Sequence, residues 1–338
     1  MRRTWMWSAP IVIAGALAWN PGGAPARAAG CAALALALDL AWRNSSRRTP
    51  IYRRHLAIFG LMALAGAALA LGPDRLGGGM SVLCSLAGAV LGLAAGSLPV
   101  LRTRRLTGLG WQRGTARRSD PRVPLILVAD PHWSGALTGL RAAQEAHPGA
   151  DWLFLGDVFD VWVGIPGMES PLETEFLEWV AHTRGQRHWV GLWLGNREYF
   201  LDALAGRFDL MGEGTGGRLE GESLVWEHGD LVNVADWRYR LWNLVSRSGA
   251  VWLFARVLPR TSARALAERL QRALHTSNRA YKVAFPREAF RAAAAEAPGA
   301  TFVTGHFHSH EVEGNGLALP WAHEGHFALW QDGTVTLL

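Results

Sequence analysis

The feature that most constrains this chain is residues 152–162, which read WLFLGDVFDVW. Residues 152–155 form a short apolar run, which is typical of a buried strand. Gly156 ends the run, and the carboxylates of Asp157 and Asp160 follow it. A carboxylate just past the end of a buried strand is costly unless a positive charge compensates it. We therefore predict that Asp157 lies between two metal ions.

Four other segments also place an apolar run directly before polar residues that can bind metals. These polar residues are Asp130-Pro131-His132, Gly195-Asn196-Arg197-Glu198, Glu227-His228-Gly229-Asp230 and Gly305-His306-Phe307-His308. In open α/β sheets, ligands bind outside the carboxyl ends of the strands, so these segments are expected to meet. The predicted metal ligands are Asp130, His132, Asp157, Asn196, His228, His306 and His308. This set contains no thiolate, which favours Mn²⁺, with Fe or Zn as alternatives, over a structural zinc site.

The order D-x-H, G-D-x-x-D, G-N-R-E, H-G-D, G-H-x-H resembles the calcineurin-like metallophosphoesterase family. The resemblance implies a β-sandwich flanked by helices, with two divalent metal ions at one edge of its sheets. It implies that one ion is held by Asp130, His132, Asp157 and His308, and the other by Asp157, Asn196, His228 and His306. Two such ions clamp a phosphate group and lower the pKa of a bound water for in-line attack.

A narrower resemblance is to the UDP-2,3-diacylglucosamine pyrophosphohydrolases of lipid A biosynthesis. It depends on G-D-V-F-D-x-W, on G-N-R, and on H-G-D followed by Asp236 and Tyr239. It implies cleavage of UDP-2,3-diacylglucosamine to UMP and 2,3-diacylglucosamine 1-phosphate (lipid X) by water attack on the α-phosphorus. The implied catalytic residues are Asp157, Asn196, Arg197 and His228, and the implied substrate-binding residues are Arg197, Asp236, Tyr239, Asn278 and Lys282.

Three positions near the motifs depart from the usual pattern of these families. Arg197 stands where many phosphoesterases carry a histidine, which suits a phosphate leaving group that needs charge stabilisation more than a proton. Glu198 replaces the usual aspartate, and Phe307 replaces the usual threonine. Asp160 and Glu198 are expected to orient a ligand histidine or the arginine.

The alternation of elements along the C-terminal part predicts an α/β, layered fold. Strands are predicted at 124–129, 152–155, 188–194, 223–227, 300–304, 316–321 and 325–330. Helices are predicted at 134–146, 170–183 and 199–206, and a long helical region at 235–296. The predicted domains are a transmembrane helical region at 1–104, a basic linker at 105–120, and a metallophosphoesterase domain at 121–338 with a helical-hairpin cap at 235–285.

The N-terminal region contains four apolar segments, at 4–19, 28–42, 55–72 and 80–101. The last two are long enough to cross a hydrocarbon core of about 30 Å, and the first two are shorter. Arginines gather on alternate sides of the segments, so the positive-inside rule places both chain ends in the cytoplasm. We expect a multi-pass protein of the inner (cytoplasmic) membrane with its catalytic domain on the cytoplasmic side. The alternatives are a cleaved signal peptide at the N-terminus and buried helices of a soluble domain.

The predicted cap carries aromatic and aliphatic residues interleaved with arginines, a pattern typical of interfacial helices. It is expected to be two helices, broken at Pro259 and Arg260, that hold acyl chains beside the metals. The alternative is an ordinary core stripe with the arginines on a solvated face. The expected partners are a lipid-linked nucleotide and a membrane, and the basic charge without a stacking motif argues against nucleic acid. No protein partner is indicated.

Two other functions are compatible with the sequence. One is a different phosphodiesterase or phosphatase of the same fold, which Arg197 and the aromatic cap disfavour. The other is a membrane scaffold without activity, which the full ligand set disfavours. Cys31 and Cys84, the two cysteines, both lie in the apolar N-terminal part, so disulfide and thiol chemistry are not expected in the catalytic domain.

Overall fold

The structure is a computed structural model of the 338-residue chain. It describes residues 31–32, 34–36, 38, 57–58, 60–64, 83–90, 92, 115–134, 136–247, 249–259, 261–262, 265, 269, 285–322 and 325–338. The chain divides into two compact units. One comprises Met1–Thr103, Gly108–Gly110 and Leu244–Trp252, and the other comprises Arg104–Thr107, Trp111–Asn243 and Leu253–Leu338.

The described residues of the N-terminal part are short helical pieces. Their buried side chains include Cys31, Ala35, Ile58, Met62 and Ala89, which form a small apolar cluster. Within the described ranges, no helix is both long and apolar enough to cross a bilayer. Most of the four predicted membrane segments lies outside those ranges, so the spans stay a prediction.

The described residues from 115 onward form two six-stranded sheets and a two-stranded ribbon. The strands are β1 (Thr115–Ala116), β2 (Leu125–Val128), β3 (Asp151–Phe154), β4 (Trp162–Val163), β5 (Val190–Leu194), β6 (Glu198–Tyr199), β7 (Leu210–Glu213), β8 (Gly217–Leu219), β9 (Leu224–Glu227), β10 (Thr301–Thr304), β11 (Glu311–Glu313), β12 (Gly316–Ala318), β13 (Ala328–Gln331) and β14 (Thr334–Leu337). The β2 sheet has the order β14-β13-β2-β3-β5-β7, and the β10 sheet has the order β1-β8-β9-β10-β12-β11. The central strands of each sheet are parallel, and β4 pairs with β6.

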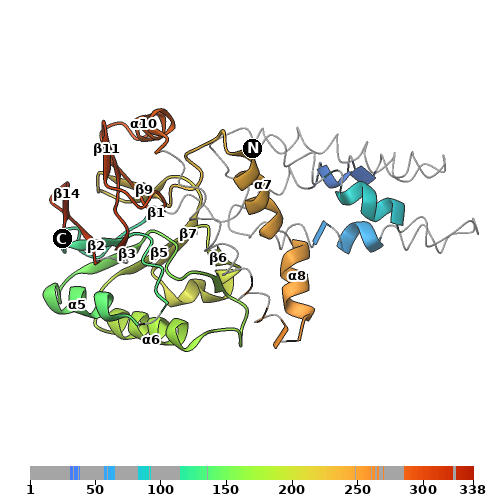
Figure 1. The fold of residues 1–338 in the computed structure, drawn as a ribbon, viewed down its shortest axis with the longest axis horizontal. Coiled ribbons are helices and arrows are strands. Elements are labelled where there is room, and N and C mark those ends of the chain that lie inside the picture. Colours follow the sequence, from blue (N-terminus) through green and yellow to red (C-terminus); the bar gives the residue numbers. More distant parts are fainter. Residues whose placement is uncertain are drawn as a thin grey trace, which may run out of the picture. The chain divides into compact units, whose positions relative to one another are not determined.

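The described part of the chain after residue 115 also contains helices. They are α5 (Thr138–Ala146), α6 (Pro171–Gly185), α7 (Trp237–Ser246), α8 (Gly249–Val257) and α10 (Arg287–Ala295), together with the 3₁₀ helix η2 (Leu201–Arg207). In Figure 1, α10 and the pair α5 and α6 lie on opposite sides of the strands. A capping box fixes the start of α6. The side chains of Ser170 and Glu173 each accept a hydrogen bond from the backbone N–H of the other residue, and Pro171 occupies the first turn.

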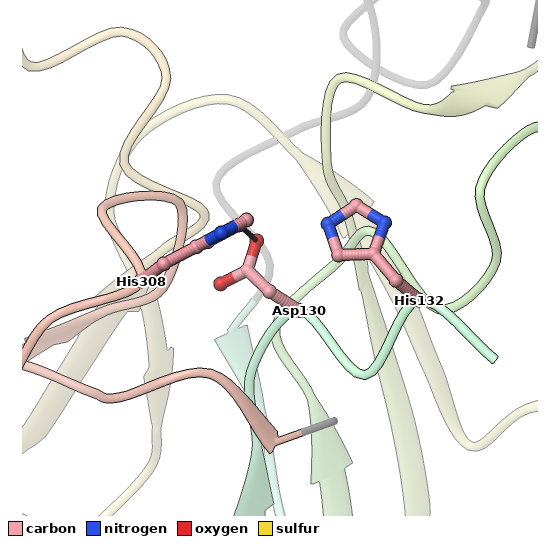
Figure 2. A group of neighbouring side chains, drawn as sticks. All are labelled: Asp130, His132 and His308. Atoms are coloured by element: carbon pink, nitrogen blue, oxygen red, sulfur yellow. Dashed lines mark ion pairs between the residues drawn. The ribbon is translucent and has the colours of Figure 1, made fainter. Parts of the chain in front are cut away.

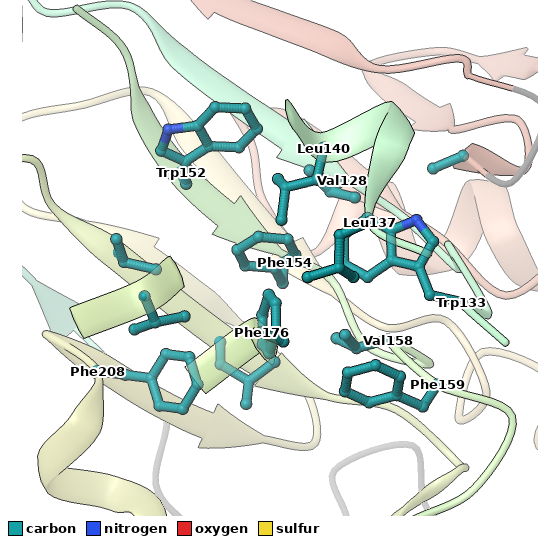
Figure 3. Packing of buried hydrophobic residues seen from close by; sticks show 14 of the residues in the cluster. Val128, Trp133, Leu137, Leu140, Trp152, Phe154, Val158, Phe159, Phe176 and Phe208 are labelled. Carbon is teal, nitrogen blue, oxygen red and sulfur yellow. The ribbon is translucent and has the colours of Figure 1, made fainter. Parts of the chain in front are cut away.

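Alternating side chains divide each central strand between two cores. Ile126 and Val128 of β2 point toward α5 and α6, where aromatic residues such as Phe154 and Phe176 fill the space (Figure 3). Leu125 and Leu127 point the other way, into the core between the two sheets. A third cluster packs α10 on the far face of the β10 sheet. The order of layers is therefore helix, sheet, sheet, helix, as the predicted layered α/β fold requires.

Three local differences from the predicted elements have physical causes. The predicted first cap helix is broken earlier than Pro259, since α7 ends at Ser246 and α8 begins at Gly249, a residue that weakens helices. The helix predicted at 199–206 is instead a 3₁₀ helix at Leu201–Arg207, and Tyr199 belongs to β6. The end of the predicted linker forms β1, and Arg118 beyond it is buried.

Candidate metal centre

All five motifs lie in loops at the carboxyl ends of parallel strands. The loops follow β2, β3 and β5 in one sheet and β9 and β10 in the other. Backbone hydrogen bonds connect them directly: the Asp130 N–H donates to the Gly156 carbonyl at 3.2 Å, and the His132 N–H donates to the Asp157 carbonyl at 3.1 Å. The His306 N–H donates to Asp130 Oδ2 at 2.6 Å, which joins the two sheets at this edge.

One group of candidate ligands surrounds Asp130. Figure 2 shows the imidazoles of His132 and His308 on either side of the Asp130 carboxylate. His308 Nε2 lies 3.7 Å from Asp130 Oδ1, and one ligand atom from each of these three residues lies within 4.8 Å of the others. Asp130 is fully buried, whereas the His308 side chain is 32% exposed. This group can hold one cation.

A second group of candidate ligands surrounds Asn196. Its Oδ1 lies 3.0 Å from His228 Nε2 and 3.0 Å from His306 Nδ1. His228 Nδ1 lies 2.8 Å from the Leu155 carbonyl, which can only accept, so Nδ1 carries the proton. Nε2 is therefore the nitrogen that can bind a metal once its own proton is lost, and the carbonyl fixes the plane of the ring.

Asp157 lies between the two groups. Its Oδ2 is 3.7 Å from His132 Nε2, and its Oδ1 is 3.6 Å from His228 Nε2. Each oxygen thus faces a histidine of a different group, which is the geometry expected of a bridging carboxylate. One ligand atom each from Asp130, Asp157 and His228 also lies within 4.8 Å of the others.

The loop that carries Asp157 is held by the buried carboxylate of Glu198. It accepts hydrogen bonds from the backbone N–H groups of Asp157 at 3.0 Å, Val158 at 2.8 Å and Gly195 at 2.7 Å. The pairing of β4 with β6 connects the same two loops a few residues further on. Glu198 was expected to orient a ligand side chain, and the structure shows that it orients the ligand backbone.

Five predicted ligands have left-handed backbone conformations. Their φ angles are 50° for Asp130, 43° for His132, 51° for Asp157, 69° for His306 and 54° for His308. Such angles cost a non-glycine residue about 1 kcal/mol or more and cluster at functional sites. Gly156 also has a positive φ, and a Cβ there would lie 2.7 Å from His228 Nδ1. The backbone is thus strained at these residues, and Gly156 allows it to pass close to His228, so that the ligand side chains point toward one another.

Burial and mutual charge set the protonation of the site. Burial lowers the pKa of His132 to about 3 and that of His306 to about 4, so both rings are neutral ligands near pH 7. Burial raises the pKa of Asp157 to about 7, with further contributions from Glu198 and Asp130. Burial opposes the charged form of His228, but Asp157, Asp130 and Asp230 outweigh it and raise its pKa to about 9.

The residues present fit divalent cations. Asp130 Oδ1 and His132 Nδ1 are buried and have no hydrogen-bond partner among the described residues. Leaving a buried carboxylate oxygen without a partner is costly, and a cation at this position would remove that cost. The described Asp and His groups are therefore consistent with a site for two metal ions.

Arg197 and Asp160 lie at the rim of this cluster. The Arg197 side chain is 5% exposed, its Nη1 donates to the Asp160 carbonyl at 3.3 Å, and its Nε lies 3.8 Å from Asp157 Oδ2. Its Nε has no hydrogen-bond partner in the described part of the chain. Asp160 Oδ1 is 3.6 Å from His132 Nδ1, so Asp160 is placed to orient that ring.

The predicted substrate-binding residues are only partly placed. The Tyr239 ring centroid lies 6.2 Å from that of His306, and the Tyr239 hydroxyl donates to Asp230. Asp236 caps α7, because its Oδ1 accepts from the Tyr239 N–H at 2.9 Å. Asn278 and Lys282 lie outside the described residues.

Three contacts near the ligands were not predicted from the sequence. Asn243 donates to the Tyr239 hydroxyl at 3.0 Å, and its position four residues further along α7 was the available signal. Phe307 packs against Phe285 with centroids 4.9 Å apart, which connects the His306 loop to the core under α10. Trp321 stacks on His308, and nothing in the local sequence pattern indicated this.

Comparison with known proteins agrees with the resemblance drawn from the motifs. A curated UDP-2,3-diacylglucosamine hydrolase from Aeromonas hydrophila subsp. hydrophila is 33% identical over 156 residues, which is 43% of this chain and 64% of that protein. The chain thus spans somewhat less than two thirds of the length of this relative. No protein-family model matches the chain.

Proposed function

We propose that the protein is a metal-dependent hydrolase that cleaves the pyrophosphate of UDP-2,3-diacylglucosamine into UMP and 2,3-diacylglucosamine 1-phosphate. The observation that carries this proposal is the convergence of the predicted ligands around Asp157 from five separate loops. The likeness to a UDP-2,3-diacylglucosamine hydrolase supports the choice of substrate.

The side chains divide into two sets of metal ligands in this proposal. Asp130, His132 and His308 hold one ion, Asn196, His228 and His306 hold the other, and Asp157 bridges them. Two bound divalent ions supply Lewis acidity for in-line displacement at phosphorus. Mn²⁺ is proposed as the native metal because the ligands are carboxylate, amide and imidazole groups without thiolate. The Leu155 carbonyl fixes the His228 ring through a hydrogen bond, and the Asp160 carboxylate lies 3.6 Å from His132 Nδ1, near enough to bias the orientation of that ring electrostatically.

Arg197 is assigned to the phosphate leaving group. Its guanidinium is held by the Asp160 carbonyl, and its Nε is available at the edge of the ligand cluster. A fixed guanidinium can stabilise the negative charge that develops on a departing phosphate without having to deliver a proton. This role fits a pyrophosphate better than an ester of a simple alcohol.

The cap helices α7 and α8 bury polar side chains and expose apolar ones, which supports a lipid substrate. α7 buries the polar side chains of Arg240 and Asn243, and Arg247, just after its end, is also buried. The same helix exposes two apolar side chains, since Trp242 is 42% and Val245 is 50% exposed. On α8, three large apolar side chains are exposed, namely Leu253, Phe254 and Val257. Buried polar groups combined with exposed apolar ones are informative, since water favours the opposite arrangement. Arg240 and Arg247 are buried, which argues against a core stripe with a solvated arginine face, whereas Arg256 is exposed as that alternative expects.

Location at the cytoplasmic face of the inner membrane is part of the same proposal. Its support is the four apolar segments of the N-terminal region and the arginines between them. A lipid-linked nucleotide presents its pyrophosphate at the membrane surface, so an anchored hydrolase would meet it there.

The proposal is tested by turnover of the purified full chain in detergent with Mn²⁺. UDP-2,3-diacylglucosamine and a generic aryl phosphodiester are offered side by side, and UMP release is measured by chromatography. UMP release from the lipid alone is expected. Cleavage of the generic ester alone would overturn the assigned substrate while keeping a metal hydrolase.

Asp157→Ala should abolish turnover while the domain still folds, because the bridging carboxylate is lost and the core residues are unchanged. Circular dichroism checks the fold, and metal analysis counts the retained ions. Near-normal turnover by this variant would contradict a two-metal mechanism.

A further inference from the structure

Trp321 lies against two of the candidate ligands. Its ring stacks on the His308 imidazole with centroids 5.1 Å apart and planes 14° apart. It also meets the His132 ring edge to face, with centroids 6.2 Å apart. The rings of His132 and His308 are themselves 5.3 Å apart, so the three rings form one aromatic group beside Asp130.

The backbone fixes Trp321 in this position from both sides. The Leu319 N–H donates to the Thr304 carbonyl at 2.8 Å, and the Ala322 N–H donates to the Ala129 carbonyl at 3.0 Å. Thr304 ends β10, which leads to His308, and Ala129 follows β2 and directly precedes Asp130. The segment that carries Trp321 is therefore attached to the two strands whose loops supply the ligands on either side of it.

His308 is the ligand with the greatest need for such support. Its side chain is 32% exposed, whereas those of His132, Asp157 and Asp130 are 6%, 4% and 0% exposed. An exposed imidazole has room to change rotamer, and each alternative rotamer carries its nitrogen away from the metal. A flat ring stacked on one face removes much of that freedom.

We propose that Trp321 is a positioning residue that holds the His308 imidazole in its metal-binding orientation. The proposal rests on the metal site of the proposed function. It predicts that Trp321 sets the affinity of the ion held by Asp130, His132 and His308, and leaves the ion held by Asn196, His228 and His306 unchanged. Loss of a residue that orients a ligand typically weakens metal binding by about 10- to 100-fold.

The test is a Mn²⁺ titration of the metal-free full chain, with free Mn²⁺ counted by electron paramagnetic resonance. W321L removes the ring, and W321F keeps a flat ring for stacking. W179L is the matched control, because Trp179 is also a partly buried tryptophan that stacks on an aromatic ring, that of Phe176 in the helical layer. H308A removes the ligand itself and marks the ion that Trp321 is expected to affect.

In wild type, two ions are expected to bind. In W321L, one ion should bind at least about tenfold more weakly, whereas W321F and W179L should remain close to wild type. Adding W321L to H308A should cause no further loss, because both changes act on the same ligand. Equal affinity in W321L and wild type would overturn the inference alone, whereas a wild type that binds no Mn²⁺ would overturn the metal site and the proposed function.

A second measurement covers the case in which W321L does not fold. In the Zn²⁺-loaded wild type, stacking on an indole should shift the His308 ring protons upfield in the NMR spectrum, and W321F should reduce this shift. The signals are assigned from their absence in H308A. Unshifted His308 signals in the wild type would overturn the inference.

Discussion

At the scale of single residues, Glu198 connects the fold to the chemistry. Its carboxylate acts on the backbone of the ligand loops, where it accepts the N–H groups of Asp157, Val158 and Gly195. A glutamate reaches one methylene further than the aspartate usual at this position. The longer side chain allows one carboxylate to fix two ligand loops at once.

Glu198→Gln should weaken both metal binding and the fold. The amide keeps the size of the side chain, but its NH₂ group faces a backbone donor, so at least one buried N–H loses its acceptor. The loss of such a bond costs about 1–3 kcal/mol of unfolding free energy. Urea denaturation and Mn²⁺ titration measure the two effects. Glu220→Gln, at an exposed turn, is the control, and equal behaviour of the two variants would contradict this role.

The protonation of the site predicts how pH affects the metal-free protein. The pKa of His228 is raised to about 9, so between pH 7 and pH 9 the folded state holds a proton that the unfolded state has lost. Folded-state stability should therefore decrease as pH rises through this window, by up to about 1 kcal/mol per pH unit. Urea denaturation at pH 7, 8 and 9 measures this trend.

Bound metal should remove this pH dependence of stability. A bound metal ion would displace the proton of His228 and that of Asp157, whose pKa is raised to about 7, so metal affinity should rise with pH until these protons are lost. Calorimetry in buffers of different ionisation enthalpy measures the protons released. Zero proton release at pH 7 would contradict the raised pKa values of Asp157 and His228.

The ligand residues could be predicted from the sequence because each follows a strand directly. A residue directly after a buried parallel strand lies in the loop at the carboxyl end of that strand, and these loops meet at one edge of the sheets. It gives no information about contacts made through the backbone or across distant loops. Glu198 acting on three N–H groups and Trp321 stacking on His308 both depend on tertiary geometry, so the sequence pattern did not reveal them.

At the scale of elements, α7 combines two tasks. Its inner face carries Tyr239 and Asn243, which form a hydrogen-bonded group with Asp230 beside His306. Its outer face exposes Trp242 and Val245. One helix therefore presents polar groups toward His306 and apolar groups outward, an arrangement that would suit the proposed lipid substrate.

Replacing Trp242 and Phe254 together by serine should weaken lipid turnover selectively. Both side chains are exposed, so the fold should tolerate the change, while the acyl chains of the substrate would have less apolar surface to bind. The expected result is a higher KM for UDP-2,3-diacylglucosamine and unchanged Mn²⁺ affinity. Val312→Ser, at an exposed apolar residue of β11, is the control. Equal KM values in the double variant and wild type would contradict acyl contact by the cap.

The strands that could be predicted are the buried central ones, whose apolar runs are continuous. The strands that were missed as separate elements are short or lie near sheet edges, and include β1, β4, β6, β8, β11 and β14. β11 (EVE) and β14 (TVTL) alternate polar and apolar residues, but they are only three and four residues long and largely exposed, so the alternation is too short to predict a strand. β7, at the edge of the β2 sheet, contains Gly212, which lowers its strand signal. The break between α7 and α8 falls at residues 246–249, which read SRSG, and this polar stretch with its glycine was the available signal.

At the scale of the whole catalytic domain, Arg118 joins the two sheets. It is 3% exposed, and it pairs with Asp151 at the start of β3 at 3.1 Å and with Glu222 in the β8–β9 turn at 2.8 Å. It also donates to the carbonyls of Pro121 and Val123. Because Asp151 begins β3 and the metals lie beyond its carboxyl end, this connection is at the opposite edge of the sheets.

Arg118→Met should destabilise the domain strongly. The change leaves Asp151 and Glu222 without their buried counter-charge, which typically costs about 3–5 kcal/mol. The midpoint of urea denaturation of the full chain measures the effect. Arg122→Met removes a fully exposed arginine paired with Asp120 and should leave the midpoint unchanged. Similar midpoints for both variants would contradict a structural role for Arg118.

The left-handed backbone at Asp130, His132, Asp157, His306 and His308 has an evolutionary consequence. Glycine at each of these positions would relieve the strain, so selection for stability alone would favour their replacement. Only a continuing demand for catalysis opposes that drift. A descendant protein that no longer acts on its substrate should therefore lose these ligand residues early. Its melting temperature should then be higher than that of a relative that is still active.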